Sequence, residues 1–161
     1  MKQINATIKG VITGAVIITI LYIAFNAKVK SDSFIYLIYL LYAAGILWTL
    51  IDYRRSGLHD NKFKEFFNQG FRCFIVVTLF MVIHTFIFYK VHIDELAVQF
   101  KVSLQELKDK TPADIETDVN NFRKNYPIFQ AGFALFQYLV IGALISGIAS
   151  AFFSQKRNEI A

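Results

Sequence analysis

Arg72 and His84 lie inside a run of the chain, from Phe66 to Tyr89, that is otherwise apolar. Ionisable side chains within lipid are costly, and they commonly serve transport, proton relay or ligand binding. A proton relay centred on His84 would also need a carboxylate at membrane depth, but none of the long apolar runs contains Asp or Glu. A hydrogen bond from His84 to a neighbouring helix is therefore the simpler interpretation. A small ion-coupled or proton-coupled transporter remains an alternative.

The segment that precedes Arg72 has the densest positive charge in the chain. Several phenylalanines accompany the basic residues there, a pattern typical of an amphipathic entry into a membrane span. Contact with anionic headgroups is worth about 1 kcal/mol for each basic residue near the surface. A specific site for a phosphate-bearing lipid is the alternative to such general contact. The lipid-headgroup candidates are Arg54, Arg55, Lys62, Lys64 and Arg72.

Small residues form a third pattern, and it indicates helix packing. They recur at spacings of four, which places them on one face of a helix and lets two backbones approach closely. We expect packing inside the protein, with homodimerisation through the last apolar run as the alternative. The residues are Gly10 and Gly14 in the first run, then Gly142, Ser146 and Ser150 with the adjacent ridge of Ala143, Gly147 and Ala151 in the last.

Four long apolar blocks contain these residues: 10–27, 34–51, 66–89 and 127–153. A transmembrane helix needs about 20 apolar residues. Hydrophobic residues make up 55% of the 161 residues and charged residues only 18%, which excludes a disordered chain, a basic nucleic-acid module and a disulfide scaffold. Cys73 is the single cysteine, so no internal disulfide forms and no cysteine pair binds metal. We therefore predict an all-α polytopic protein: one membrane domain over 1–161, with four transmembrane helices in a bundle.

The charged segment 90–126 is expected to be helical as well. Ile93, Ala97 and Phe100 belong to an apolar face with spacings of three and four, and Leu96, Leu104 and Leu107 extend it. Thr111 and Pro112 then predict an N-cap and a first helical residue. We expect Pro127 to open the fourth span in the same way. The apolar faces of this segment would pack on each other and on the membrane surface, or dock another protein.

The orientation follows from basic residues beside the spans. An even number of spans places the N-terminus, the loop from Asp52 to Glu65 and the C-terminus on one side. Basic residues stand close to the spans on that side, whereas in 90–126 they are diluted through a long segment. We expect both termini in the cytoplasm and 90–126 outside.

The whole chain, and most strongly the stretch from Tyr53 to Phe71, resembles a bacterial family called domain of unknown function 4199. The basic pair Arg54-Arg55, the phenylalanine-rich stretch and the Gly70-Phe71 step carry the resemblance, together with the charged insertion before the last span. Members are small inner-membrane proteins with four predicted spans. The resemblance implies a bacterial inner-membrane location. It transfers no activity or catalytic residue.

The functional expectation is a non-enzymatic inner-membrane protein, an accessory subunit of a larger envelope assembly. It rests on the lack of a nucleophile with its base and of paired acid and base groups. We expect no cofactor, metal or nucleic-acid partner. Expected partners are anionic lipid headgroups at the inner face, a membrane protein that contacts 90–126, or a second copy of the chain. The alternative function is the handling or flipping of a phosphate-bearing lipid in an envelope or lipid-linked glycosylation pathway.

Overall fold

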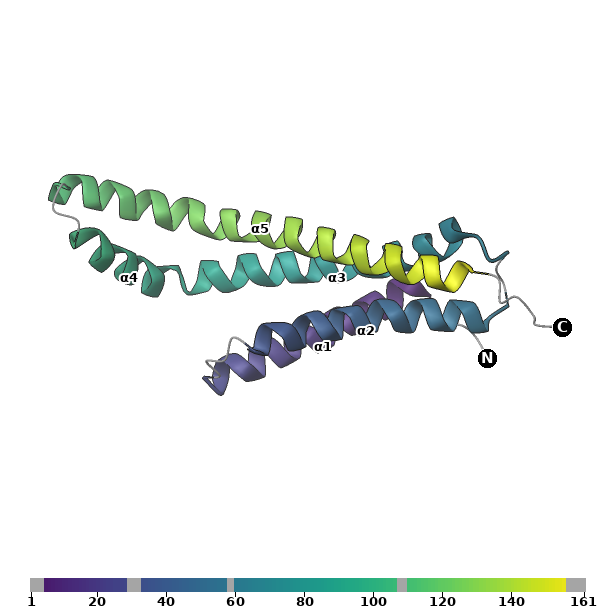
Figure 1. Cartoon of the computed structure of the whole chain (residues 1–161). Coiled ribbons are helices and arrows are strands. Elements are labelled where there is room, and N and C mark those ends of the chain that lie inside the picture. Colours follow the sequence, from purple (N-terminus) through teal and green to yellow (C-terminus); the bar gives the residue numbers. More distant parts are fainter. Residues whose placement is uncertain (1–4, 29–32, 58–59, 107–109, 156–161) are drawn as a thin grey trace. The chain divides into compact units, whose positions relative to one another are not determined.

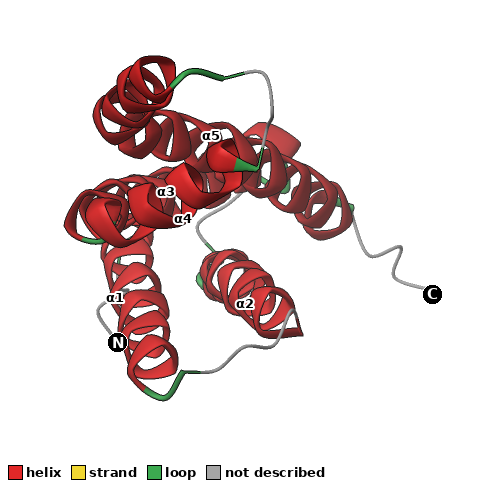
Figure 2. Cartoon of the chain, turned by 90° about the vertical axis from the view of Figure 1, so that its left-hand side faces the viewer, coloured by secondary structure: helices red, strands yellow, loops and turns green. Residues whose placement is uncertain are grey.

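The part of the chain that the structure describes folds into five helices, which Figure 1 shows in chain order. This computed structural model describes residues 5–28, 33–57, 60–106 and 110–155, and within these ranges it contains helices and loops without a strand (Figure 2). Four of the five helices are long and apolar enough to cross a membrane. The predicted all-α class with four apolar spans is confirmed. The helices are α1 (Ala6–Asn26), α2 (Ser33–Arg55), α3 (Phe63–Val91), α4 (Ile93–Gln105) and α5 (Pro112–Ser154).

Helix α5 begins where the sequence predicted, at Thr111 and Pro112. The backbone N–H of Asp114 donates to Oγ1 of Thr111 (3.3 Å), while the Asp114 carboxylate accepts from both the N–H and the hydroxyl of Thr111. This reciprocal arrangement satisfies backbone donors that a helix start leaves open. Thr111 is thus the N-cap, and Pro112 is the first helical residue.

Pro127 does not open a separate span, and that expectation was wrong. It lies buried inside α5, which continues for 43 residues. A proline within a helix removes one backbone hydrogen bond and crowds the carbonyl four residues earlier. Transmembrane helices tolerate this because other groups can satisfy the freed carbonyl. The second helix of segment 90–126 and the fourth span are therefore one element, about twice as long as a bilayer requires.

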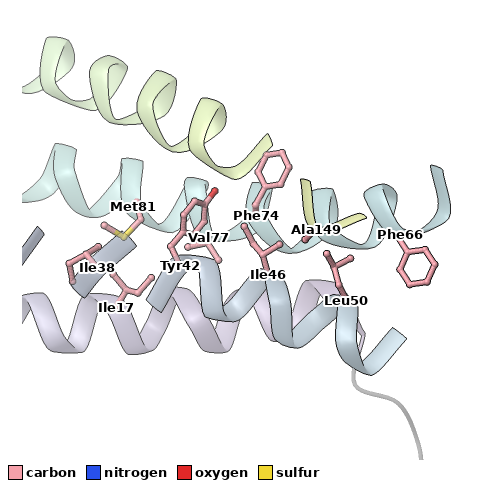
Figure 3. Packing of buried hydrophobic residues seen from close by; sticks show 10 residues of the cluster. All are labelled: Ile17, Ile38, Tyr42, Ile46, Leu50, Phe66, Phe74, Val77, Met81 and Ala149. Carbon is pink, nitrogen blue, oxygen red and sulfur yellow. The ribbon is translucent and has the colours of Figure 1, made fainter. Parts of the chain in front are cut away.

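The chain forms two compact units, which we describe separately. The single membrane domain expected from the sequence stays a prediction. The first unit comprises Met1–Met81 and Phe136–Ala161, and thus α1, α2, the first part of α3 and the last part of α5. All four helices contribute to its core. Figure 3 shows this core as a row of side chains, from Ile38 and Met81 at one end to Leu50 and Phe66 at the other.

The second unit, Val82–Leu135, contains the end of α3, all of α4 and the first part of α5. Its core joins Ala97 and Leu104 of α4, two residues of the predicted apolar face, to Ile115 and Val119 of α5. Phe122 adds a stack on Phe100, with ring centroids 4.4 Å apart. Ion pairs of Lys110 with Asp118 and of Arg123 with Asp94 join charged side chains at the surface of the unit. Leu107, also expected on the apolar face, lies outside the described residues.

Glycines mark the places where helices of the first unit approach most closely. A Cβ atom at Gly10 of α1 would lie 2.6 Å from the carbonyl oxygen of Cys73 in α3, and one at Gly14 would lie 3.0 Å from the Phe80 ring. A Cβ at Gly70 would lie 2.8 Å from the Ser146 hydroxyl of α5. These backbones can meet only because the side chains are absent, as small-residue packing in membranes requires.

Only one of the two ridges of the last span takes part in this packing. Gly142, Ser146 and Ser150 are buried, and a Cβ at Gly142 would meet the Tyr42 hydroxyl and, at 2.8 Å, the Phe74 ring. The adjacent ridge points away: Ala143 is exposed, and no atom lies within 4 Å of where a Gly147 Cβ would be. The expectation that Gly147 and Ala143 pack inside the protein was wrong. Each residue of the second ridge follows one of the first ridge in sequence, and one residue corresponds to a rotation of about 100° around the helix axis.

This division predicts opposite outcomes for two changes on neighbouring turns of α5. Gly142→Leu should destabilise the protein in detergent by roughly 2–3 kcal/mol, because the added side chain overlaps the Phe74 ring and Tyr42. Gly147→Leu should leave the midpoint of thermal unfolding nearly unchanged. Equal losses of stability in both variants would show that the second ridge packs as well.

Candidate functional site

The first unit contains an ion pair between two helices, formed by Lys9 of α1 and Asp52 of α2. The Lys9 ammonium donates to the Asp52 carboxylate and lies 5.4 Å from the centre of the Trp48 ring. The Lys9 side chain is only 3% exposed, against 37% for Asp52. Burying an ammonium group this deeply is costly unless a carboxylate compensates for the lost water. The pair therefore holds the start of α1 against the end of α2.

Helix electrostatics does not account for these two charges. Lysine at the start of a helix and aspartate near the end of one both oppose the helix macrodipole. Each charge is therefore stabilised by the other charge and not by the dipole of its own helix. The pair was not predicted, because Lys9 and Asp52 each flank an apolar block and a flanking charge does not by itself indicate a partner. One signal was present: the start of one helix and the end of the next lie at the same end of a hairpin, and here they carry opposite charges.

A group of small polar side chains lies beside this pair. The Thr49 hydroxyl donates to the Gly45 carbonyl (3.0 Å), and the Cys73 thiol donates to the same oxygen at 3.7 Å. Gly45 is itself a close-approach position, because a Cβ there would lie 2.5 Å from the Thr13 side chain. Cys73 and Thr49 are therefore used in packing α2 against α1 and α3.

Tyrosines form a second polar group further along the same unit. The Tyr42 hydroxyl donates to the Tyr138 carbonyl (3.0 Å) and lies 3.3 Å from the Thr78 hydroxyl. Gln137 donates to the Tyr39 hydroxyl. These contacts connect α2 to α3 and α5, and interhelical hydrogen bonds of this kind average about 0.6 kcal/mol each in a membrane protein.

The two buried serines of α5 differ from these groups. Ser146 and Ser150 are fully buried, and their hydroxyls make no hydrogen bond within the part of the chain that the structure describes. The Ser146 hydroxyl instead faces Gly70 across the helix contact. The helix contact therefore depends on the small size of these two side chains and not on their hydroxyl groups.

The five lipid-headgroup candidates separate into two sets in the structure. Lys62 forms an ion pair with Asp60 (2.8 Å), which raises the pKa of the Lys62 ammonium, and the Arg54 guanidinium lies 5.5 Å from the centre of the Phe153 ring. The other three candidates are exposed and form no ion pair with any described residue: Arg55, Lys64 and Arg72.

His84 belongs to the second unit and is half-buried. Its ring stacks on Phe88, one turn further along α3, with centroids 6.0 Å apart. Phe88 in turn contacts the ring of His92, whose Nδ1 lies 2.8 Å from the Phe88 carbonyl oxygen. Among the described residues no group of three or more His, Cys, Asp or Glu side chains is arranged to hold a metal ion. The arrangement around His84 thus contains aromatic stacking, without a set of candidate metal ligands.

Comparison with known proteins identifies the family. Residues 6–155 match the family model described as Protein of unknown function (DUF4199), so the chain belongs to this family. The match covers all five helices and agrees with the resemblance in the sequence. No curated protein and no solved structure matches the chain.

Proposed function

We propose that this member of the DUF4199 family is a non-enzymatic accessory subunit of a larger assembly in the bacterial inner membrane. Segment 90–126, which belongs to the second unit, is proposed as the part that contacts the partner. Four apolar helices support a multi-pass membrane protein. The polar groups of the first unit, such as Tyr42 and Thr49, bond within the chain itself, which supports a role in packing.

Exposed valines on the second unit carry this proposal. Val91 is 70% exposed, Val98 61% and Val102 52%. None of the three belongs to the buried core of the second unit. Isolated apolar side chains at a surface need no explanation, but Val98 and Val102 lie four residues apart on one exposed face of α4, which supports contact with a partner. The occupant we propose is an apolar segment of another membrane protein. Lipid at the membrane surface is the competing occupant.

Photo-crosslinking at the valines tests the proposed partner contact. A benzophenone amino acid placed at Val98 or Val102 should yield a discrete protein adduct in native membranes, because these side chains would lie in the interface. The same group at Gln99 or Ser103, exposed polar positions of α4, is the matched control and should give much less of that adduct. Adducts with lipid alone at Val98 and Val102 would contradict the proposal.

We also propose that both termini face the cytoplasm and that segment 90–126 lies outside. A cysteine at Ser103 should then react with an impermeant maleimide when the outer face of the inner membrane is accessible, as in spheroplasts. A cysteine at Arg55 should react only after lysis. The unchanged protein is the background control, because its single cysteine, Cys73, is buried. The reverse labelling pattern would overturn this orientation.

A further inference from the structure

Three polar residues form a stripe on the outer face of α3 in the first unit. Lys64, Asn68 and Arg72 follow one another at four-residue spacing, and all three are exposed. Residues four apart on a helix lie one above the other on the same face. The stripe therefore presents an ammonium, an amide and a guanidinium along about two turns.

The acidic residues near the stripe are already engaged elsewhere. Asp52 pairs with Lys9, and Asp60 pairs with Lys62. The Glu65 carboxylate accepts a hydrogen bond from the Asp60 N–H (2.9 Å). Lys64 and Arg72 thus keep charges that no described part of the chain neutralises.

Contacts of the neighbouring residue place Arg72 at the edge of the apolar zone. Cys73 meets α1 at Gly10, where a Cβ would lie 2.6 Å from the Cys73 carbonyl oxygen. Gly10 follows the paired Lys9 and begins the uncharged stretch of α1. Arg72 therefore lies level with the start of that stretch, where hydrocarbon gives way to headgroups.

Phenylalanines beside the stripe provide an apolar surface at the same level. Phe71 is 42% exposed and its ring contacts Phe74, with centroids 5.1 Å apart. Phe63 and Phe67 continue the series towards the start of α3, stacked at 5.7 Å. A ligand at the stripe would thus meet charge on one side and exposed rings on the other, the combination that a lipid headgroup with its first acyl carbons requires.

We propose that Lys64, Asn68 and Arg72 bind the phosphate of an anionic glycerophospholipid, with its acyl chains against Phe71. The guanidinium of Arg72 has the planar pair of donors that phosphate oxygens accept in a bidentate contact. The ammonium of Lys64 supplies a second charge and the amide of Asn68 a neutral donor. This site is independent of the subunit role proposed above.

Lipid retention in the purified full-length protein tests the site. The protein is reconstituted in nanodiscs of phosphatidylglycerol and phosphatidylcholine, extracted in mild detergent, and its bound lipid is measured by native mass spectrometry. The wild type should retain phosphatidylglycerol in preference to phosphatidylcholine. The double variant Lys64→Gln/Arg72→Gln should lose that preference by about tenfold or more, because two headgroup contacts are removed.

A matched double variant separates this site from general surface charge. Lys101→Gln/Lys124→Gln removes the same charge from exposed positions outside the stripe, and it should leave the preference within about twofold. Equal losses in the two double variants would overturn the site, as would a wild type without preference. Thermal unfolding midpoints of all three proteins should agree, because every altered side chain is exposed.

Competition with soluble anions distinguishes a lipid from free phosphate. Millimolar inorganic phosphate or glycerol phosphate should not displace phosphatidylglycerol from the wild type, since neither contacts the phenylalanines. Displacement by inorganic phosphate would overturn the lipid assignment.

Discussion

A polar group within a bilayer can form hydrogen bonds only with the protein or with water that the protein admits, and this constraint decides which residues meet in the first unit. Lys9 satisfies it through Asp52, Tyr42 through the Tyr138 carbonyl and Thr78, and Cys73 through the Gly45 carbonyl. Each of these contacts joins two different helices. The polar residues therefore specify which helices are neighbours, while the apolar row of Figure 3 fills the space between them.

Such contacts require close backbones, which explains where the small residues lie. Gly45 lets Thr13 of α1 approach α2 next to the Thr49 and Cys73 bonds, and Gly142 leaves room for the Tyr42 hydroxyl. A larger side chain at either position would separate the groups that must bond. Ser146 and Ser150 also allow close approach of helices through their small size, although their hydroxyls form no hydrogen bond with the described residues. Close approach and polar satisfaction therefore depend on each other.

Sequence reasoning succeeded where the information is local. Length and hydropathy predict the four apolar helices, the three-and-four spacing predicts the apolar face of α4, and Thr111 with Pro112 predicts the start of α5.

Sequence reasoning failed where tertiary context decides. Proline propensity predicted a boundary at Pro127, but α5 continues through it. Two small-residue ridges 100° apart look alike in sequence, and only the placement of Tyr42 and Phe74 shows that Gly142 packs and Gly147 does not. The pairing of Lys9 with Asp52 likewise depends on how α1 and α2 pack. The sequence around either residue does not contain that information.

The most direct test of this account is a double-mutant cycle on the ion pair, with unfolding free energies measured in detergent. Asp52→Asn should be more destabilising than Lys9→Met, because it leaves a buried ammonium without its carboxylate, whereas Lys9→Met leaves a carboxylate that water partly reaches. Breaking a fully buried pair costs about 3–5 kcal/mol, and the partial exposure of Asp52 reduces the loss for Lys9→Met. The double variant Lys9→Met/Asp52→Asn should recover much of the stability lost in Asp52→Asn, with a coupling energy of roughly 1–3 kcal/mol. Single losses that add within about 0.5 kcal/mol would contradict the account, because the two side chains would then be independent.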